Sequence, residues 1–318
     1  MQVWSAPPLI LTNCTGRKRR VGPVVGLPHD LRPASVRALA ESWRSTLQRA
    51  TTRLPARSLY VGRSVADAIK SSTVSGGELL VVSAGLGLVH SEDVIPAYDL
   101  TVAEGAGMLS ASLRSLGADA GSWWRELADI GVGRGLIAQQ ILLRRGRVAL
   151  IALPSTYLEM VREDLDSLGD ADLERVRIFT SSAGRASLPE RLRSCALPYD
   201  SRLESIPGYA GTTVDYPQRA LRHFVECLRG HLLGTASAGD AVEAALEGLS
   251  MLERPARARL SDEAIARVIK EHWCANGGSS TRLLRFVRRE AGIACEQSRF
   301  RDIWRDVRAD LLREGRLQ

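Results

Sequence analysis

The chain of 318 residues is 45% hydrophobic and carries a formal net charge of +7, which is typical of a globular protein with one large domain or a domain plus a smaller one. No run of about 18 apolar residues occurs and no signal-peptide pattern opens the chain, so we expect a cytoplasmic protein with no membrane partner. Five scattered cysteines and five histidines form no Cys-x-x-Cys pair or paired-histidine motif, which argues against disulfides, a zinc site and any other metal or cofactor.

Short apolar segments alternate with helical patterns over the first two thirds of the chain. A helix is expected over 33–50, and strands are expected at 8–12, 59–61, 79–82, 148–153 and 176–179. Continuous apolar strands separated by helices are usually buried on both faces. We therefore expect an α/β fold with a mostly parallel central sheet and helices on both faces, in which ligands bind at the carboxyl ends of the strands.

The pattern changes after residue 183. Residues 188–215 are rich in Pro, Gly, Ser and Tyr and predict an irregular segment, and 254–257 predict a linker. The expected helices of this part are 216–233, 238–252, 261–273, 280–291 and 298–313. These patterns predict an α/β domain with a helical extension over 1–253 and an all-helical basic region over 254–318.

Basic residues gather in two places, the turn 17–20 and the C-terminal region. From Met251 onward the chain has 15 Arg or Lys residues and 10 Asp or Glu residues. Two sets of arginines are spaced to share one helical face each: Arg282, Arg285 and Arg289, and Arg301, Arg305 and Arg308. These sets favour a helix-turn-helix-like module that binds double-stranded DNA. The alternative is a helical bundle whose arginines pair with its own carboxylates.

Polar residues follow the first and third expected strands. Asn13 can contact a base edge or position a water, and Arg17 and Lys18 in the turn after it can hold a phosphate. Ser83 and Gly85 leave the strand 79–82, and the small glycine permits close approach of a ligand. The alternatives are an ordinary polar turn and a structural loop.

Further along the chain, Tyr98 can stack on a base, and Asp99 can polarise a water or stabilise an oxocarbenium-like sugar. Ser155 and Thr156 follow the strand 148–153 directly and can bond a DNA phosphate. Arg185 is a further base near a strand end. Asp99 and the two hydroxyl residues are equally suited to capping the helices that follow them.

Three segments, 59–63, 82–88 and 95–101, together resemble a bacterial and phage family. Its members carry a strand ending in Ser-Ala-x-x-Gly-Leu and then Pro-x-Tyr-Asp, and it is similar to the uracil-DNA-glycosylase-like module of archaeal tRNA-guanine transglycosylases. Residues 153–156 also resemble the His-Pro-Ser-Pro loop of uracil-DNA glycosylases, with Leu153 in place of the histidine. The Gly-Gln-Asp-Pro-Tyr motif that activates water is absent, so Asn13 or Asp99 would have to substitute for it.

The resemblance covers residues 8–185 and implies a uracil-DNA-glycosylase-like fold. It adds Arg63 to Ser83, Gly85 and Tyr98 as substrate-binding residues. Some relatives of this broad kind act in phage defence and remove hypermodified bases, including glucosylated hydroxymethylcytosine, from DNA. That substrate is implied by the resemblance alone.

These observations predict a monofunctional DNA glycosylase without an obligate protein partner. The flipped base stacks on Tyr98, and Asp99, with Asn13, assists the attack of water at C1′. No lysine stands out as a Schiff-base nucleophile, so β-elimination is not expected. Two alternatives stay open: a hydrolase or transferase of free nucleosides or nucleotides, as in deazapurine metabolism, and a regulator that senses a nucleotide and binds an operator.

Overall fold

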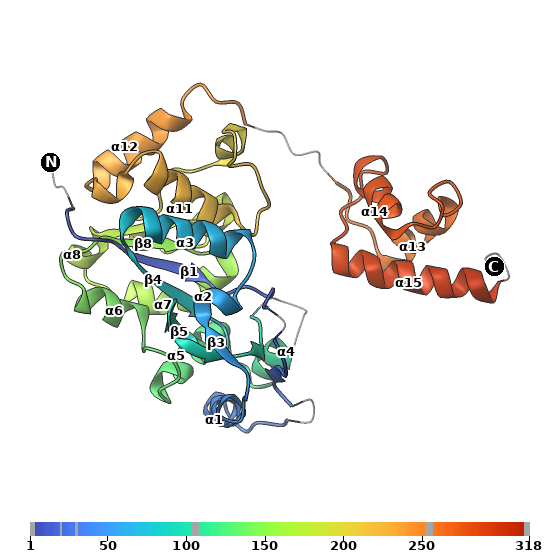
Figure 1. Ribbon diagram of the computed structural model, residues 1–318, viewed down its shortest axis with the longest axis horizontal. Coiled ribbons are helices and arrows are strands. Elements are labelled where there is room, and N and C mark those ends of the chain that lie inside the picture. The colour runs from blue at the N-terminus through green and yellow to red at the C-terminus, as the bar shows by residue number, and fades with distance from the viewer. Residues whose placement is uncertain (1–3, 20, 29–30, 103–107, 252–256, 315–318) are drawn as a thin grey trace. The chain divides into compact units, whose positions relative to one another are not determined.

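The computed structural model describes residues 4–19, 21–28, 31–102, 108–251 and 257–314 (Figure 1). The chain divides into two compact units, residues 1–252 and 253–318. Each unit has a buried hydrophobic core of its own. None of the described helices is long and apolar enough to cross a membrane.

The first unit is built on a five-stranded sheet in the order β5-β4-β1-β8-β9. Its strands are β1 (Leu9–Asn13), β4 (Glu78–Ser83), β5 (Gly87–His90), β8 (Ala149–Ala152) and β9 (Val176–Phe179). All neighbouring pairs are parallel except β4 and β5, which are antiparallel. This confirms the expected α/β class and the mostly parallel sheet.

Helices cover both faces of this sheet, as expected, because successive residues of a strand point to opposite faces. On one face, Ile10, Leu150 and Phe179 pack with α3 (Arg63–Ser75), α11 (Tyr216–Glu226) and α12 (Thr235–Leu246). On the other, neighbouring strand residues share a core with α1 (Val36–Gln48), α5 (Ala120–Asp129), α6 (Ile137–Leu143) and α7 (Ser155–Asp166) (Figure 1).

Short elements connect these layers. Two small sheets pair β2 (Val25–Gly26) with β7 (Tyr98–Asp99) and β3 (Arg53–Pro55) with β6 (Val94–Pro96). The remaining helices are α2 (Ala56–Leu59), α4 (Met108–Ser115), α8 (Asp170–Leu173), α9 (Ser182–Ala186), α10 (Glu190–Arg193), η1 (Ser201–Ser205) and η2 (Gly230–Leu232).

Three sequence predictions about local structure differ from the structure, and one of them is the helix expected over 238–252, which is α12 and ends at Leu246. The strand expected at 59–61 is the end of α2, followed by a single bridge between Tyr60 and Lys18. A short apolar run does not distinguish a strand from a buried helical turn. The helix expected over 216–233 ends at Glu226, ahead of Arg229, whose φ of 47° is left-handed and incompatible with a continuing helix.

The second unit contains α13 (Asp262–Glu271), α14 (Ser280–Arg289) and α15 (Gln297–Arg313), close to the ranges expected from the sequence. Apolar residues of all three helices form its core: Ile265, Ile269, Leu283, Val287, Ile303 and Val307. Gly277 and Gly278 both adopt left-handed φ values before α14, which lets the chain turn sharply there. Of the expected linker 254–257, residues 254–256 lie outside the described part of the chain, as does Arg20 of the basic turn.

Candidate functional site

The carboxyl ends of β1, β4 and β8 meet at one edge of the sheet. The backbone N–H of Cys14 donates to Val82 O at 2.9 Å, which continues the pairing of β1 with β4. Gln218, from α11, bridges β1 and β8, because its Nε2 donates to Thr12 Oγ1 at 3.0 Å and to Ala152 O at 2.8 Å. Asn13, Ser83 and Ser155 therefore leave the sheet at the same edge, as parallel strands require.

A chain of three buried hydroxyl groups lies at this edge. Ser83 Oγ is 2.6 Å from Tyr98 OH, which is 2.8 Å from Tyr60 OH. Ser83 Oγ also accepts hydrogen bonds from the amides of Gly85 and Leu86, which occupy both of its lone pairs. Ser83 therefore donates its proton to Tyr98, and either hydroxyl can be the donor in the bond between Tyr98 and Tyr60. Burial raises the pKa of both tyrosines, so both stay protonated.

Tyr98 is fully buried, which conflicts with the expectation that a flipped base stacks on it. A Cβ at Gly85 would come within 2.7 Å of the Tyr98 ring, and the ring of Trp43 lies 6.2 Å from it in an edge-on arrangement. Lys18 Nζ lies 4.2 Å from the ring centroid. No face of the ring is open to a base in this structure, because these neighbours complete its packing.

Lys18 and Asp99 are neighbours at the surface of this cluster. Asp99 is exposed on β7, next to Tyr98 in the chain, while Lys18 is half-buried. Burial lowers the pKa of Lys18, and electrostatic interaction with Cys14 and Asp99 opposes part of that shift. The Cys14 thiol, which is itself buried, lies 3.0 Å from Tyr157 OH at the start of α7.

Asn13 occupies a structural position instead of facing an open cleft. Its side chain is 5% exposed, its Nδ2 donates to Cys14 O at 2.7 Å, and its Oδ1 accepts from Gln218 Nε2 at 2.8 Å. Both ends of the amide are thus engaged within the protein. The expected role of Asn13 in positioning water at C1′ therefore conflicts with this structure, because its oxygen is already bonded to Gln218.

Arg63 also differs from its expected role in substrate binding. It begins α3, and its guanidinium donates to Ala210 O at 2.5 Å and to Gly208 O at 2.8 Å. These bonds tie the start of α3 to the loop before α11. Arg17, by contrast, is exposed in the turn after β1, where a phosphate can reach it.

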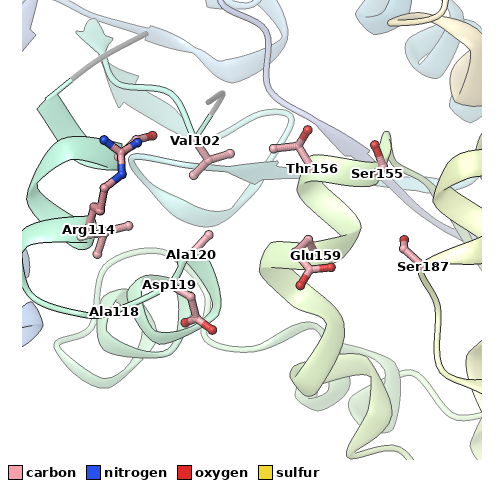
Figure 2. Close-up of a pocket in the computed structure, with 11 residues that line it drawn as sticks. Val102, Arg114, Ala118, Asp119, Ala120, Ser155, Thr156, Glu159 and Ser187 are labelled. Carbon is pink, nitrogen blue, oxygen red and sulfur yellow. The ribbon is translucent and has the colours of Figure 1, made fainter. Parts of the chain in front are cut away.

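A pocket of about 660 Å³ opens beside the first turns of α7, and we call it the α7 pocket (Figure 2). Its lining mixes apolar, hydroxyl and charged side chains: Val102, Ser110, Leu113, Arg114, Ala118, Asp119, Ala120, Ser155, Thr156, Glu159 and Ser187. Ser155 and Thr156 are exposed at its rim, as their expected contact with DNA requires. The volume falls in the range of small-molecule sites.

Two carboxylates that the sequence did not single out lie on the walls of the α7 pocket. Asp119 comes from the start of α5 and Glu159 from α7 (Figure 2). Hydrogen bonds from the amide and hydroxyl of Ser122 lower the pKa of Asp119, which is therefore ionised at neutral pH. The sequence could have indicated Glu159, because it lies four residues after Ser155 and residues four apart share one face of a helix.

A second pocket, of about 500 Å³, lies at the carboxyl end of β9, and we call it the β9 pocket. Arg185, Arg193 and Arg202 line it together with Thr180. Arg202 pairs with Asp200 at 2.9 Å and Arg193 with Glu190 at 3.1 Å. Arg185 is exposed, and no carboxylate of the described residues forms an ion pair with it, so it is available to a phosphate.

The arginines of the second unit differ in their surroundings. Arg301 and Arg305 both lie near Asp302, at 3.7 and 3.5 Å. Arg282 and Arg285 are exposed on α14, and within the described part of the chain neither is ion-paired. The alternative of self-paired arginines thus describes α15 better than α14.

Comparison of this chain with protein-family models, with curated proteins and with solved structures found no match.

Proposed function

We propose that the protein is a DNA glycosylase that hydrolyses the N-glycosidic bond of a modified base and leaves an abasic site. The observation that carries this proposal is the α7 pocket, which combines an apolar wall with two carboxylates at the carboxyl edge of the sheet. Its volume of about 660 Å³ accommodates a flipped nucleoside with a substituent on the base. The proposal also rests on the resemblance to a uracil-DNA-glycosylase-like fold.

Carboxylates supply the chemistry that this reaction needs. An ionised carboxylate stabilises the oxocarbenium-like sugar and orients the attacking water. Glu159 and Asp119 line the pocket and join Asp99, the residue expected from the sequence, as candidates for this role. In place of stacking on Tyr98, the base would pack on Val102, Leu113 and the alanines of the lining.

The DNA backbone would lie along the same edge of the sheet. Ser155 and Thr156 belong to the first turn of α7, where the positive end of the helix dipole favours a phosphate. Arg17 and Arg185 are exposed after β1 and β9 and provide additional positive charge. The partner is double-stranded DNA, and the candidate substrate is glucosylated hydroxymethylcytosine in phage DNA, attacked in the cytoplasm as antiviral defence.

The test is incubation of the protein with unmodified DNA and with phage DNA carrying hypermodified cytosines, followed by detection of abasic sites. We expect abasic sites only in the modified DNA. Glu159→Gln, Asp119→Asn or Asp99→Asn should reduce base release, according to which carboxylate acts at C1′, whereas Glu41→Gln, on the exposed face of α1, should not. Release from neither DNA contradicts the glycosylase, and full activity of all three carboxylate variants contradicts the assigned carboxylates.

One observation favours a second candidate function. The β9 pocket of about 500 Å³ is lined by Arg185, which has no carboxylate partner among the described residues, and by the ion-paired Arg193 and Arg202, and an exposed guanidinium there suits a phosphate of a free nucleotide. This arrangement supports either a nucleoside or nucleotide hydrolase or transferase, or a nucleotide-sensing regulator. An enzyme of that kind would turn over without DNA and be indifferent to deletion of residues 257–318, whereas a regulator would bind a specific DNA sequence without turnover.

A further inference from the structure

The chain contains only three lysines, and one of them differs from the other two. Lys70 Nζ lies 2.6 Å from Glu226 and Lys270 Nζ lies 2.5 Å from Glu314, so both are ion-paired. Lys18 is half-buried at the carboxyl edge of the sheet, and among the described residues no carboxylate lies within ion-pair distance of it. Its amine therefore lacks the close ion pair that the other two lysines have.

The backbone holds Lys18 in place. It forms an antiparallel bridge with Tyr60, and bonds on either side extend this pairing: Arg19 N donates to Leu59 O at 2.8 Å, and Val61 N donates to Arg17 O at 3.1 Å. The side chain lies against the Tyr98 ring, with Nζ 4.2 Å from the centroid. Its amine is thus positioned against an aromatic surface at the carboxyl edge of the sheet, outside the residues that line the α7 pocket.

Burial makes the neutral, nucleophilic form of this amine more accessible than that of an exposed lysine. Burial lowers the pKa of Lys18, although Asp99, Cys14 and the face of the Tyr98 ring all favour the ammonium. Arg17 and Arg19 flank it in the chain, and a guanidinium stays protonated in proteins. The turn therefore combines one group that can lose its proton with neighbouring charges that attract phosphate.

We propose that Lys18 is a nucleophile that forms an imine with the C1′ aldehyde of an abasic deoxyribose, which gives the protein a strand-cleaving lyase activity. This inference takes its substrate from the proposed function and departs from the hydrolysis-only expectation. The neutral amine adds to the C1′ carbon and a proton moves from nitrogen to oxygen. The hydroxyl group then takes a second proton from the solvent and leaves as water, which gives the protonated imine. Loss of the C2′ proton to water then expels the 3′ phosphate, and hydrolysis of the imine returns the free lysine.

The experiment uses the full chain and a DNA duplex with one preformed abasic site, so that base release is not required. Borohydride reduces an imine to a stable amine and links the protein to the DNA. We expect this cross-link with the unaltered protein and with the matched controls Lys70→Met and Lys270→Met. It should be lost with Lys18→Met and Lys18→Arg, because neither side chain forms this imine. Peptide mapping should place the modification on Lys18 and not on the terminal amine.

Either absence of a cross-link with the unaltered protein or a cross-link that persists in both Lys18 variants overturns the proposal. Thermal melting of Lys18→Arg, which keeps the charge, controls for loss of the fold. Base release from modified DNA is measured separately. Release without a cross-link leaves the glycosylase standing and rejects the lyase, whereas a cross-link without release leaves the lyase standing and rejects the glycosylase.

Discussion

Gly85 shows how a single residue can matter through the space that it leaves empty. Its backbone φ is not left-handed, so conformational freedom does not explain why a glycine suits this position. The explanation lies in contacts: a Cβ there would meet the Tyr98 ring at 2.7 Å and Trp43 at 3.3 Å. Tyr98 is held in turn by hydrogen bonds to Ser83 and Tyr60 and has little freedom to move away. Gly85 was expected to allow close approach of a ligand, but in the structure the space beside it is filled by the Tyr98 ring.

We predict that Gly85→Ala destabilises the first unit by about 1–3 kcal/mol, because the added methyl overpacks a rigid aromatic contact. Chemical denaturation, followed by tryptophan fluorescence, measures the change. Gly16→Ala, in the exposed turn after β1, is the control, since nothing lies within 4 Å of its added Cβ. Equal stability of the two variants would contradict this account of Gly85.

At the scale of elements, α11 holds the sheet together from one face. Its Gln218 bridges β1 and β8, and its Phe224 stacks edge-on with Phe179 of β9 at 5.2 Å. His223 of the same helix is buried between Tyr199 and Tyr209, and its Nδ1 lies 2.8 Å from Tyr199 OH. The stability of this packing is therefore coupled to the protonation of a histidine.

Burial lowers the pKa of His223 in the folded state below its usual value of about 6.5. The unfolded chain thus binds the proton more readily, so stability is constant above about pH 6.5 and falls as the pH drops toward the folded pKa. We predict a free energy of unfolding that falls as the pH drops below about 6.5. Urea titrations at each pH measure it.

The variant His223→Gln tests the assignment, because glutamine keeps a polar group but does not titrate. It should be less stable at neutral pH and should lose less stability on acidification than the unaltered protein. Any slope that remains includes His231, whose pKa burial also lowers. An unchanged slope in the variant would assign the acid sensitivity to other groups.

At the scale of the whole molecule, positive charge is distributed unevenly. The C-terminal residues from Met251 onward contribute +5 of the net charge of +7. Within the second unit, Arg301 and Arg305 of α15 share Asp302 of their own helix, whereas Arg282 and Arg285 of α14 project into solvent. Surface ion pairs of this kind contribute little to stability, but they reduce the charge that a polyanion meets. The second unit should therefore contact DNA mainly through α14.

We predict that Arg282→Gln with Arg285→Gln weakens duplex binding and flattens its salt dependence more than Arg301→Gln with Arg305→Gln. The slope of log Kd against log salt concentration should fall by about 0.9 for each phosphate that the variant no longer neutralises. Fluorescence anisotropy with an unmodified duplex, over a series of salt concentrations, measures both. Equal slopes for the two double variants would show that α14 has no special role.

Local sequence patterns were enough to establish the α/β class, the edge of the sheet where polar residues gather and the helical tail, because hydrophobic periodicity and helix signals act over short stretches of chain. The sequence also identified Asn13, Tyr98 and Lys18 as candidate site residues. It did not reveal their environments, since these depend on residues distant in sequence: Tyr60 is 38 residues from Tyr98, and Gln218 is 205 residues from Asn13.

Only the tertiary structure decided which polar groups form hydrogen bonds inside the protein and which face solvent. Folding buries Tyr98 and Asn13 behind partners from other elements, and it brings Asp119 and Glu159 to one pocket from two different helices. It also brings a carboxylate to ion-pair distance of Lys70 and of Lys270, whereas Lys18 has no such partner among the described residues. The physical reason is that burial and pKa are set by every group that packs around a side chain, whereas a sequence pattern reports only its neighbours along the chain.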